Sequence, residues 1–145
     1  MPEHITTKEF YQDIKKCMTN KGLLVSNNFI SPKNISARMQ FLATIYSVFG
    51  NAYFYQNKKA TYNAFTVATK SLPLTTHFNL DDIPTAMKKR VNSTLKSQQE
   101  YHLNFFRKYK IFRDDSNTFS SLFARQSMEY RKGLTAYIPS RILIN

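Results

Sequence analysis

Cysteine, glycine, tryptophan and acidic residues are scarce in this chain of 145 residues. The single cysteine, Cys17, excludes an internal disulfide and a multi-cysteine metal site, and it indicates a reducing compartment. Only three glycines are present and no Gly-x-Gly sequence occurs, which leaves little material for a phosphate-cradling loop. Because there is no run of about 18 apolar residues and no signal peptide pattern in residues 1–4, we expect a cytoplasmic protein without a membrane partner.

The shortage of acidic residues gives the chain a formal net charge of +12. Residues 1–71 and residues 72–145 each carry an excess of six positive charges, whereas nucleic-acid-binding surfaces usually concentrate charge in one stripe. The densest basic stretch, residues 107–113, also contains Tyr109 and Phe112. A solvated helix end explains this stretch, and so does a stacking surface for single strands. We expect no nucleic-acid partner, and a small basic nucleic-acid-binding module is the alternative function.

The first half of the chain predicts the order helix, strand, helix, strand, strand. Thr6 and Glu9 have the spacing of a capping box, and the helix that they open should end before Gly22 with Cys17 buried. The apolar run at residues 23–25 is typical of a strand covered on both faces. Ser31 and Pro32 have the form of a helix start.

The second helix should end at Gly50 and present one apolar stripe to the core. The stripe contains Ile35, Met39, Leu42, Tyr46 and Phe49. Residues 52–55 and 62–68 are then predicted to form an antiparallel strand pair, because a short polar link joins them.

The second half of the chain is predicted to be mainly helical. One helix is expected over residues 85–109 and another over residues 119–132, the latter capped by Ser116 or Thr118. We therefore expect an α/β sheet unit at residues 1–71 and a helical extension packed on it at residues 72–145.

The order of these elements and several local strings resemble the C-terminal half of spermidine synthase-like proteins, which have the class I methyltransferase fold. The matching strings are residues 2–11, 21–28, 48–52 and 62–70, with a weaker match at residues 114–117 and 129–131. Lys21 replaces one of the two glycines that the family has before its fifth strand, and Asn27 and Asn28 stand where true spermidine synthases carry a glutamine. The departure at Asn27 and Asn28 puts polyamine specificity in doubt.

This resemblance implies the C-terminal part of a Rossmann-like sheet followed by a helical tail. In the family, S-adenosylmethionine or its decarboxylated form binds at a Gly-rich turn, and a catalytic Asp precedes the segment that matches Pro2. Neither is expected in this chain, so we predict no catalytic residue, no cofactor-binding residue and no bound cofactor for the chain alone.

Four residues are candidates for a substrate pocket: Asn27, Asn28, Asp114 and Asp115. The two asparagines should lie just past the carboxyl end of a parallel strand, where ligands gather in α/β sheets, although they would equally suit a turn. The two aspartates read as a turn and helix cap, and they also resemble an acidic pair found near the end of many relatives. The three histidines lack metal-ligand spacing, so no metal site is expected.

The leading hypothesis is a truncated spermidine synthase-like transferase fragment that is inactive alone. A half-sheet would expose one edge strand, so we expect either a partner carrying the N-terminal half-domain or a homo-oligomer formed through that edge. An interaction subunit that completes another protein's sheet has the same fold and is the remaining alternative.

Overall fold

The computed structural model describes residues 3–29, 35–56, 63–71, 80–100 and 103–135 of the chain. Its helices and strands have the predicted order in the first half of the chain. In the second half, a short strand and a short helix, Gln98–Glu100 and Leu103–Phe106, were not predicted as separate elements. In chain order the elements are η1 (Glu3–Thr6), α1 (Lys8–Cys17), β1 (Leu23–Phe29), α2 (Ile35–Phe49), β2 (Tyr53–Tyr55), β3 (Asn63–Thr69), α3 (Thr85–Leu95), β4 (Gln98–Glu100), α4 (Leu103–Phe106) and α5 (Phe119–Thr135).

Four strands form one sheet in the order β1-β3-β2-β4, and every adjacent pair is antiparallel. The predicted antiparallel pairing of the second and third strands is confirmed, with Tyr53 opposite Val67 and Tyr55 opposite Phe65. Because β1 and β2 are both antiparallel to β3, they run in the same direction, with β3 between them. The fold is thus a mixture of helices with an antiparallel sheet, and its Rossmann-like arrangement stays a prediction.

Strand β1 is longer than predicted and is not covered on both faces. Leu23 is 56% exposed and Val25 is 60% exposed, whereas Asn28 is only 1% exposed. The alternation arises because successive side chains of a strand point to opposite faces. Only the face that carries Leu24 and Asn28 turns toward the helices, so a continuous apolar run here does not indicate burial on both sides.

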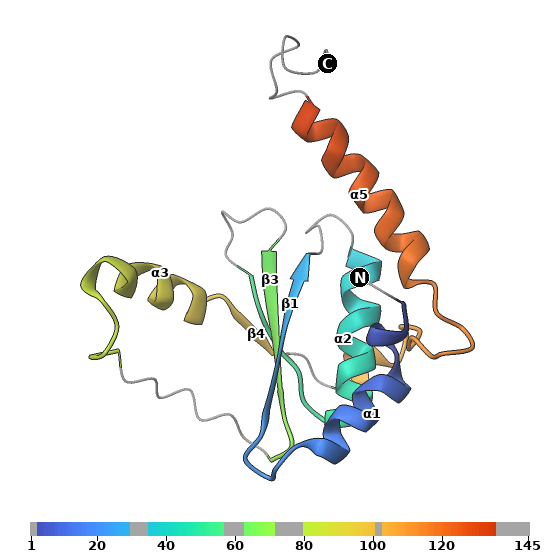
Figure 1. Ribbon diagram of the computed structural model, residues 1–145, viewed down its shortest axis with the longest axis horizontal. Coiled ribbons are helices and arrows are strands. Elements are labelled where there is room, and N and C mark those ends of the chain that lie inside the picture. Colours follow the sequence, from blue (N-terminus) through green and yellow to red (C-terminus); the bar gives the residue numbers. More distant parts are fainter. Residues whose placement is uncertain (1–2, 30–34, 57–62, 72–79, 101–102, 136–145) are drawn as a thin grey trace.

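Helices α1 and α2 cover that inner face of the sheet (Figure 1). The buried side chains of α2 lie almost all round its axis, because the sheet, α1, α4 and α5 all pack against it. They are Ala37, Met39, Phe41, Leu42, Ala43, Thr44, Ile45 and Phe49. Ile35, which was predicted to belong to the buried stripe, is 53% exposed at the first turn. The predicted start at Ser31 and Pro32 lies outside the described residues.

The predicted cap of the first helix is shifted by one residue, and its cysteine is not buried. The Oγ1 atom of Thr7, not of Thr6, accepts the N–H of Phe10 at 3.3 Å and so caps α1. Tyr11 is the side chain of α1 that is buried, at 3% exposure, while Cys17 is exposed, contrary to the expected buried thiol. Once Tyr11 faces the core, helical periodicity places Cys17 on the outer side of the last turn.

The single long helix predicted for residues 85–109 is wrong. Helix α3 ends at Leu95, where the Ser97 N–H and Oγ both donate to the carbonyl oxygen of Thr94, at 3.0 and 2.6 Å. Residues 98–100 then pair with β2 as strand β4. Helix α3 buries none of its side chains and projects away from the sheet (Figure 1).

The segment between α4 and α5 closes the core on the outer side of α2. Phe106, Phe112 and Phe119 are each at most 4% exposed and belong to the same hydrophobic cluster as Phe41. The N–H of Phe112 donates to Thr44 Oγ1 at 3.0 Å, and its carbonyl oxygen accepts the N–H of Lys8 at 2.8 Å. The predicted final helix is confirmed as α5, which follows directly on Thr118, with the Asn117 side chain accepting the N–H of Phe119 at 2.9 Å.

Candidate functional site

Asn27 and Asn28 were predicted to lie just past the end of a strand. The structure instead places both of them within strand β1. Asn28 points into the protein, where its Nδ2 donates to Thr66 Oγ1 at 2.6 Å and its Oδ1 accepts from Ser26 Oγ at 3.0 Å. Because Asn28 is 1% exposed, its amide group serves to pair two polar side chains of the sheet. Asn27 is exposed on the opposite face, across from Phe65.

The two candidate aspartates lie in the exposed turn that leads into α5. The backbone N–H of Asp114 donates to Glu9 Oε2 at 3.2 Å, and the neighbouring Arg113 guanidinium lies 3.5 Å from Glu9 Oε1. Asp115 accepts from Ser116 Oγ at 3.0 Å. These contacts fasten the turn to the first turn of α1, which is the structural role that the sequence allowed.

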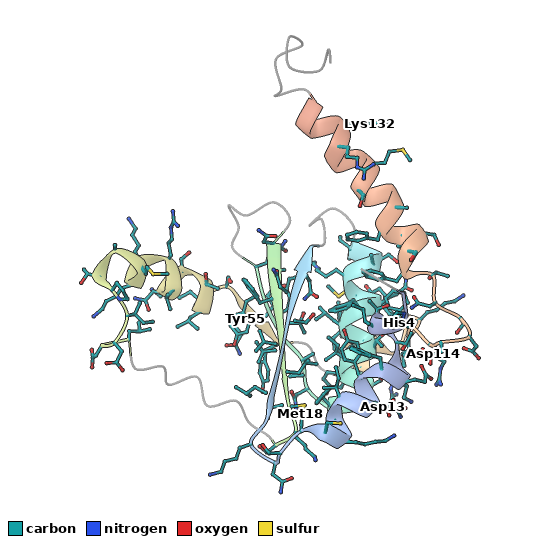
Figure 2. All side chains as sticks on the ribbon, viewed as in Figure 1. His4, Asp13, Met18, Tyr55, Asp114 and Lys132 are labelled. Atoms are coloured by element: carbon teal, nitrogen blue, oxygen red, sulfur yellow. The ribbon has the colours of Figure 1, made fainter. Side chains whose placement is uncertain are left out.

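The structure does not bring the two candidate pairs together. Asp114 lies on the outer side of helices α1 and α2, which separate it from the sheet that contains Asn27 and Asn28 (Figure 2). A surface hollow of about 600 Å³ adjoins Asp115, and Arg113 and Asn117 also line it, but no residue of β1 does. Any substrate contact by these four residues therefore involves two separate places and stays a prediction.

Strand β1 forms one edge of the described sheet. All seven of its residues pair in continuous register with β3, and none of them is charged, proline or glycine. Natural proteins usually blunt an edge with lysine, proline or a bulge. Beside this edge, the outer face exposes Leu23, Val25 and Phe65, the last by 42%. An uncharged edge next to an apolar face has the chemistry of a docking surface for another strand.

The outer face of the sheet is buried at β2, farther from the β1 edge. By register and alternation, Tyr53 and Tyr55 of β2 share this face with Val67 and Phe65, yet they are only 4% and 6% exposed. The hydroxyl of Tyr55 donates to Gln98 Oε1 of β4 at 3.0 Å. Burial, and then the nearby Tyr53, raise the pKa of Tyr55.

On the inner face, Tyr11 is the titratable group that the fold perturbs most. Burial raises the pKa of its phenol well above the ordinary value, and a hydrogen bond with the Ser26 side chain lowers it by less. A phenol with a raised pKa stays neutral at physiological pH. It therefore supplies a packed aromatic ring between α1 and the sheet, with no acid–base chemistry near neutrality.

Sequence reasoning missed a basic hollow that runs along α1 and adjoins the carboxyl-terminal end of α2. Its lining includes Lys8, Lys15 and Lys16 of α1 together with Lys70, which follows β3. The signal available in the sequence was the i and i+7 spacing of Lys8 and Lys15 on one helical face. Nothing in the sequence indicated that Lys70 would join them.

Metal and membrane chemistry find no support in the described part of the chain. Among the residues that the structure describes, no group of three or more His, Cys, Asp or Glu side chains is placed to hold a metal ion. Over the same residues, no helix has both the length and the apolar character needed to cross a membrane.

Comparisons with known proteins point to one fold. No family model matches this chain, and no curated protein matches it. Among solved structures it is similar to a probable spermidine synthase from Corynebacterium glutamicum, with 18% sequence identity and a TM-score of 0.53. The similarity covers 81% of this chain and 44% of that chain, so the chain spans less than half the length of this neighbour. A likeness at this identity shows a spermidine synthase-like fold and leaves the activity open.

Proposed function

We propose that this chain is one part of a spermidine synthase-like transferase and that it needs a second part to bind an S-adenosyl donor. In a complete enzyme of this kind, the transferred group would be aminopropyl or methyl. The proposal also places the chain in the C-terminal half of such an enzyme, as the resemblance of residues 2–11 and 21–28 implies.

The observation that carries this proposal is that β1 forms an edge of the sheet built by the described residues. A seven-residue strand with neither charge nor interruption at the edge of a sheet is suited to pairing with another strand. The adjacent apolar side chains of Leu23 and Val25 would be covered by the same partner. A partner that continues the sheet past β1 would bring with it the Gly-rich cofactor turn that this sequence lacks.

The length of the similar structure supports the same proposal. The similar region amounts to 44% of the Corynebacterium glutamicum protein. More than half of a comparable enzyme would then have to come from elsewhere, either from another segment or from another chain. The catalytic Asp and the cofactor turn expected from the family resemblance would belong to that remainder.

Isothermal titration calorimetry with decarboxylated S-adenosylmethionine tests the proposal. The 145-residue chain should give no binding heat, and S-adenosylmethionine should give none either. The Corynebacterium glutamicum protein, titrated in the same buffer, is the positive control. Saturable binding to the isolated chain would overturn the proposal, because the cofactor site would then lie within these residues.

A sheet-completing subunit without activity of its own is the second candidate, and the same β1 edge favours it. The two candidates differ only when the partner is present. A reconstituted complex that transfers an aminopropyl or methyl group identifies a divided enzyme. A stable complex that binds no S-adenosyl donor identifies an interaction subunit.

A further inference from the structure

A hollow of about 530 Å³ brings three lysines of one helix together with a fourth from a distant part of the sequence. Lys8, Lys15 and Lys16 come from α1, and Lys70 comes from the residue after β3. The other described residues of the lining are Gln12, Ser47 and Val48, so none of the described lining residues carries a carboxylate. It uses no residue of β1 and is independent of the proposed function.

Two of these lysines are held in place by helix ends. The Lys15 Nζ donates to the carbonyl oxygen of Val48 at 2.6 Å, and the Lys70 Nζ donates to that of Met18 at 3.0 Å. Cations are favoured at the carboxyl-terminal ends of helices, which accounts for both contacts. Because an ammonium group has three donors, each lysine keeps two for another acceptor.

The charge of the hollow is only partly balanced. Lys16 pairs with Asp13 at 2.8 Å, and both side chains are more than 70% exposed. Four ammonium groups therefore face a single nearby carboxylate among the contacts described. Like charges gathered in this way repel one another, and a bound anion with several negative oxygens would relieve the repulsion.

We propose that this hollow binds a small ligand that carries two or more phosphate groups. Lysine is a common phosphate ligand because its ammonium is a compact charge with three donors. A compact ligand suits this site better than a nucleic-acid strand, because the lysines come from segments that converge on one hollow and do not form an extended stripe.

Calorimetric titration with sodium tripolyphosphate at low ionic strength tests this site. The Lys8→Gln/Lys16→Gln variant should bind about tenfold more weakly than the wild-type chain, because it loses two charges without touching either helix-capping lysine. The matched control is Lys88→Gln/Lys89→Gln on α3, which removes the same charge and should change the affinity by less than about twofold.

The outcomes separate the possible readings. Absence of tripolyphosphate binding, or equal binding by all three proteins, overturns the proposal. A short oligothymidylate serves as the second probe, and binding of it alone, lost in Lys8→Gln/Lys16→Gln, would reassign the hollow to nucleic acid. Circular dichroism melting checks that the variants fold. If the double variant unfolds, Lys16→Gln alone, at an exposed position, should still weaken tripolyphosphate binding by about threefold.

Discussion

Asn51 fastens the turn after α2 to the last residue of β3. Its Nδ2 donates to the carbonyl oxygen of Thr69 at 2.8 Å, and its Oδ1 accepts the N–H of Thr69 at 2.9 Å. Asn51 and Thr69 are both buried, so water cannot replace these two hydrogen bonds. The pair thereby fixes the end of the sheet against the end of a core helix.

We predict that Asn51→Ala lowers the free energy of unfolding by about 2–3 kcal/mol, because both backbone groups of Thr69 would be left buried and unpaired. Urea denaturation followed by circular dichroism measures the change. Asn27→Ala, at an exposed position, is the control and should stay within about 0.5 kcal/mol of wild type. Equal losses in the two variants would contradict the role given to Asn51.

At this scale the sequence shows which polar side chains are present, but it does not predict what each of them contacts. The asparagines at 27 and 28 and the aspartates at 114 and 115 were singled out for their polar chemistry. Whether such a group faces a ligand or a neighbouring side chain depends on the strand phase, which one residue reverses. Asn28 and Thr66 meet through a register between segments 38 residues apart, and no local pattern specifies that register.

At the scale of elements, Gly50 ends α2 in a left-handed conformation. Its φ is +78°, and its N–H donates to the carbonyl oxygen of Tyr46 at 2.8 Å. A Cβ added to Gly50 would find nothing within 4 Å. The need for glycine here is therefore conformational and does not come from crowding.

Gly50→Ala is expected to destabilise the protein by about 1 kcal/mol, and Gly50→Asn by less, because asparagine tolerates the left-handed region better than alanine. Thermal melts of the two variants beside wild type give the comparison. If alanine proved as stable as glycine, the helix would not end in the conformation described.

Elements with strong local signals were predicted correctly, and those that depend on distant partners were not. The capping and glycine signals gave the places of α1 and α5 and the end of α2 to within a few residues. The break between α3 and β4 was missed because residues 96–100 contain no glycine or proline to interrupt a helix. Gln98–Glu100 form a strand because they pair with β2, which lies some 40 residues earlier in the chain.

At the scale of the whole molecule, the uncharged β1 edge and the exposed Val25 should make the isolated chain associate. Size-exclusion chromatography with light scattering is expected to show oligomers whose mass rises with protein concentration. Val25→Lys should shift the chain toward monomer, because a lysine beside an edge strand opposes pairing. Met87→Lys makes the same chemical change on α3, where Met87 is 54% exposed, and should leave the distribution unchanged.

A monomeric wild-type chain at all concentrations would remove the argument from the β1 edge. It would leave the fold likeness intact, since that rests on the comparison of structures. The calorimetric test of cofactor binding then becomes the deciding experiment.

The overall pattern of helices and strands in residues 1–71 could be read from the sequence, whereas the candidate sites could not. The basic hollow needs α1, α2 and Lys70 to meet, and the open outer face needs the phase of β1. Both are products of packing between segments. Local periodicity predicts which residues share a face of a helix or strand, but it does not predict which face another element will cover.

Helix α2 has a consequence for how the chain is made. It buries Phe41 and Leu42 between the sheet and a layer that includes Phe112 and Phe119. Phe112 and Phe119 leave the ribosome more than 60 residues after these core positions of α2. Even Ile45, a later buried residue of the same helix, precedes Phe112 by 67 positions. During that interval a helix with many apolar side chains lacks its outer layer. Synthesis should therefore pass through a nascent chain that chaperones recognise, and slow translation before Phe112 should lower the yield of folded protein.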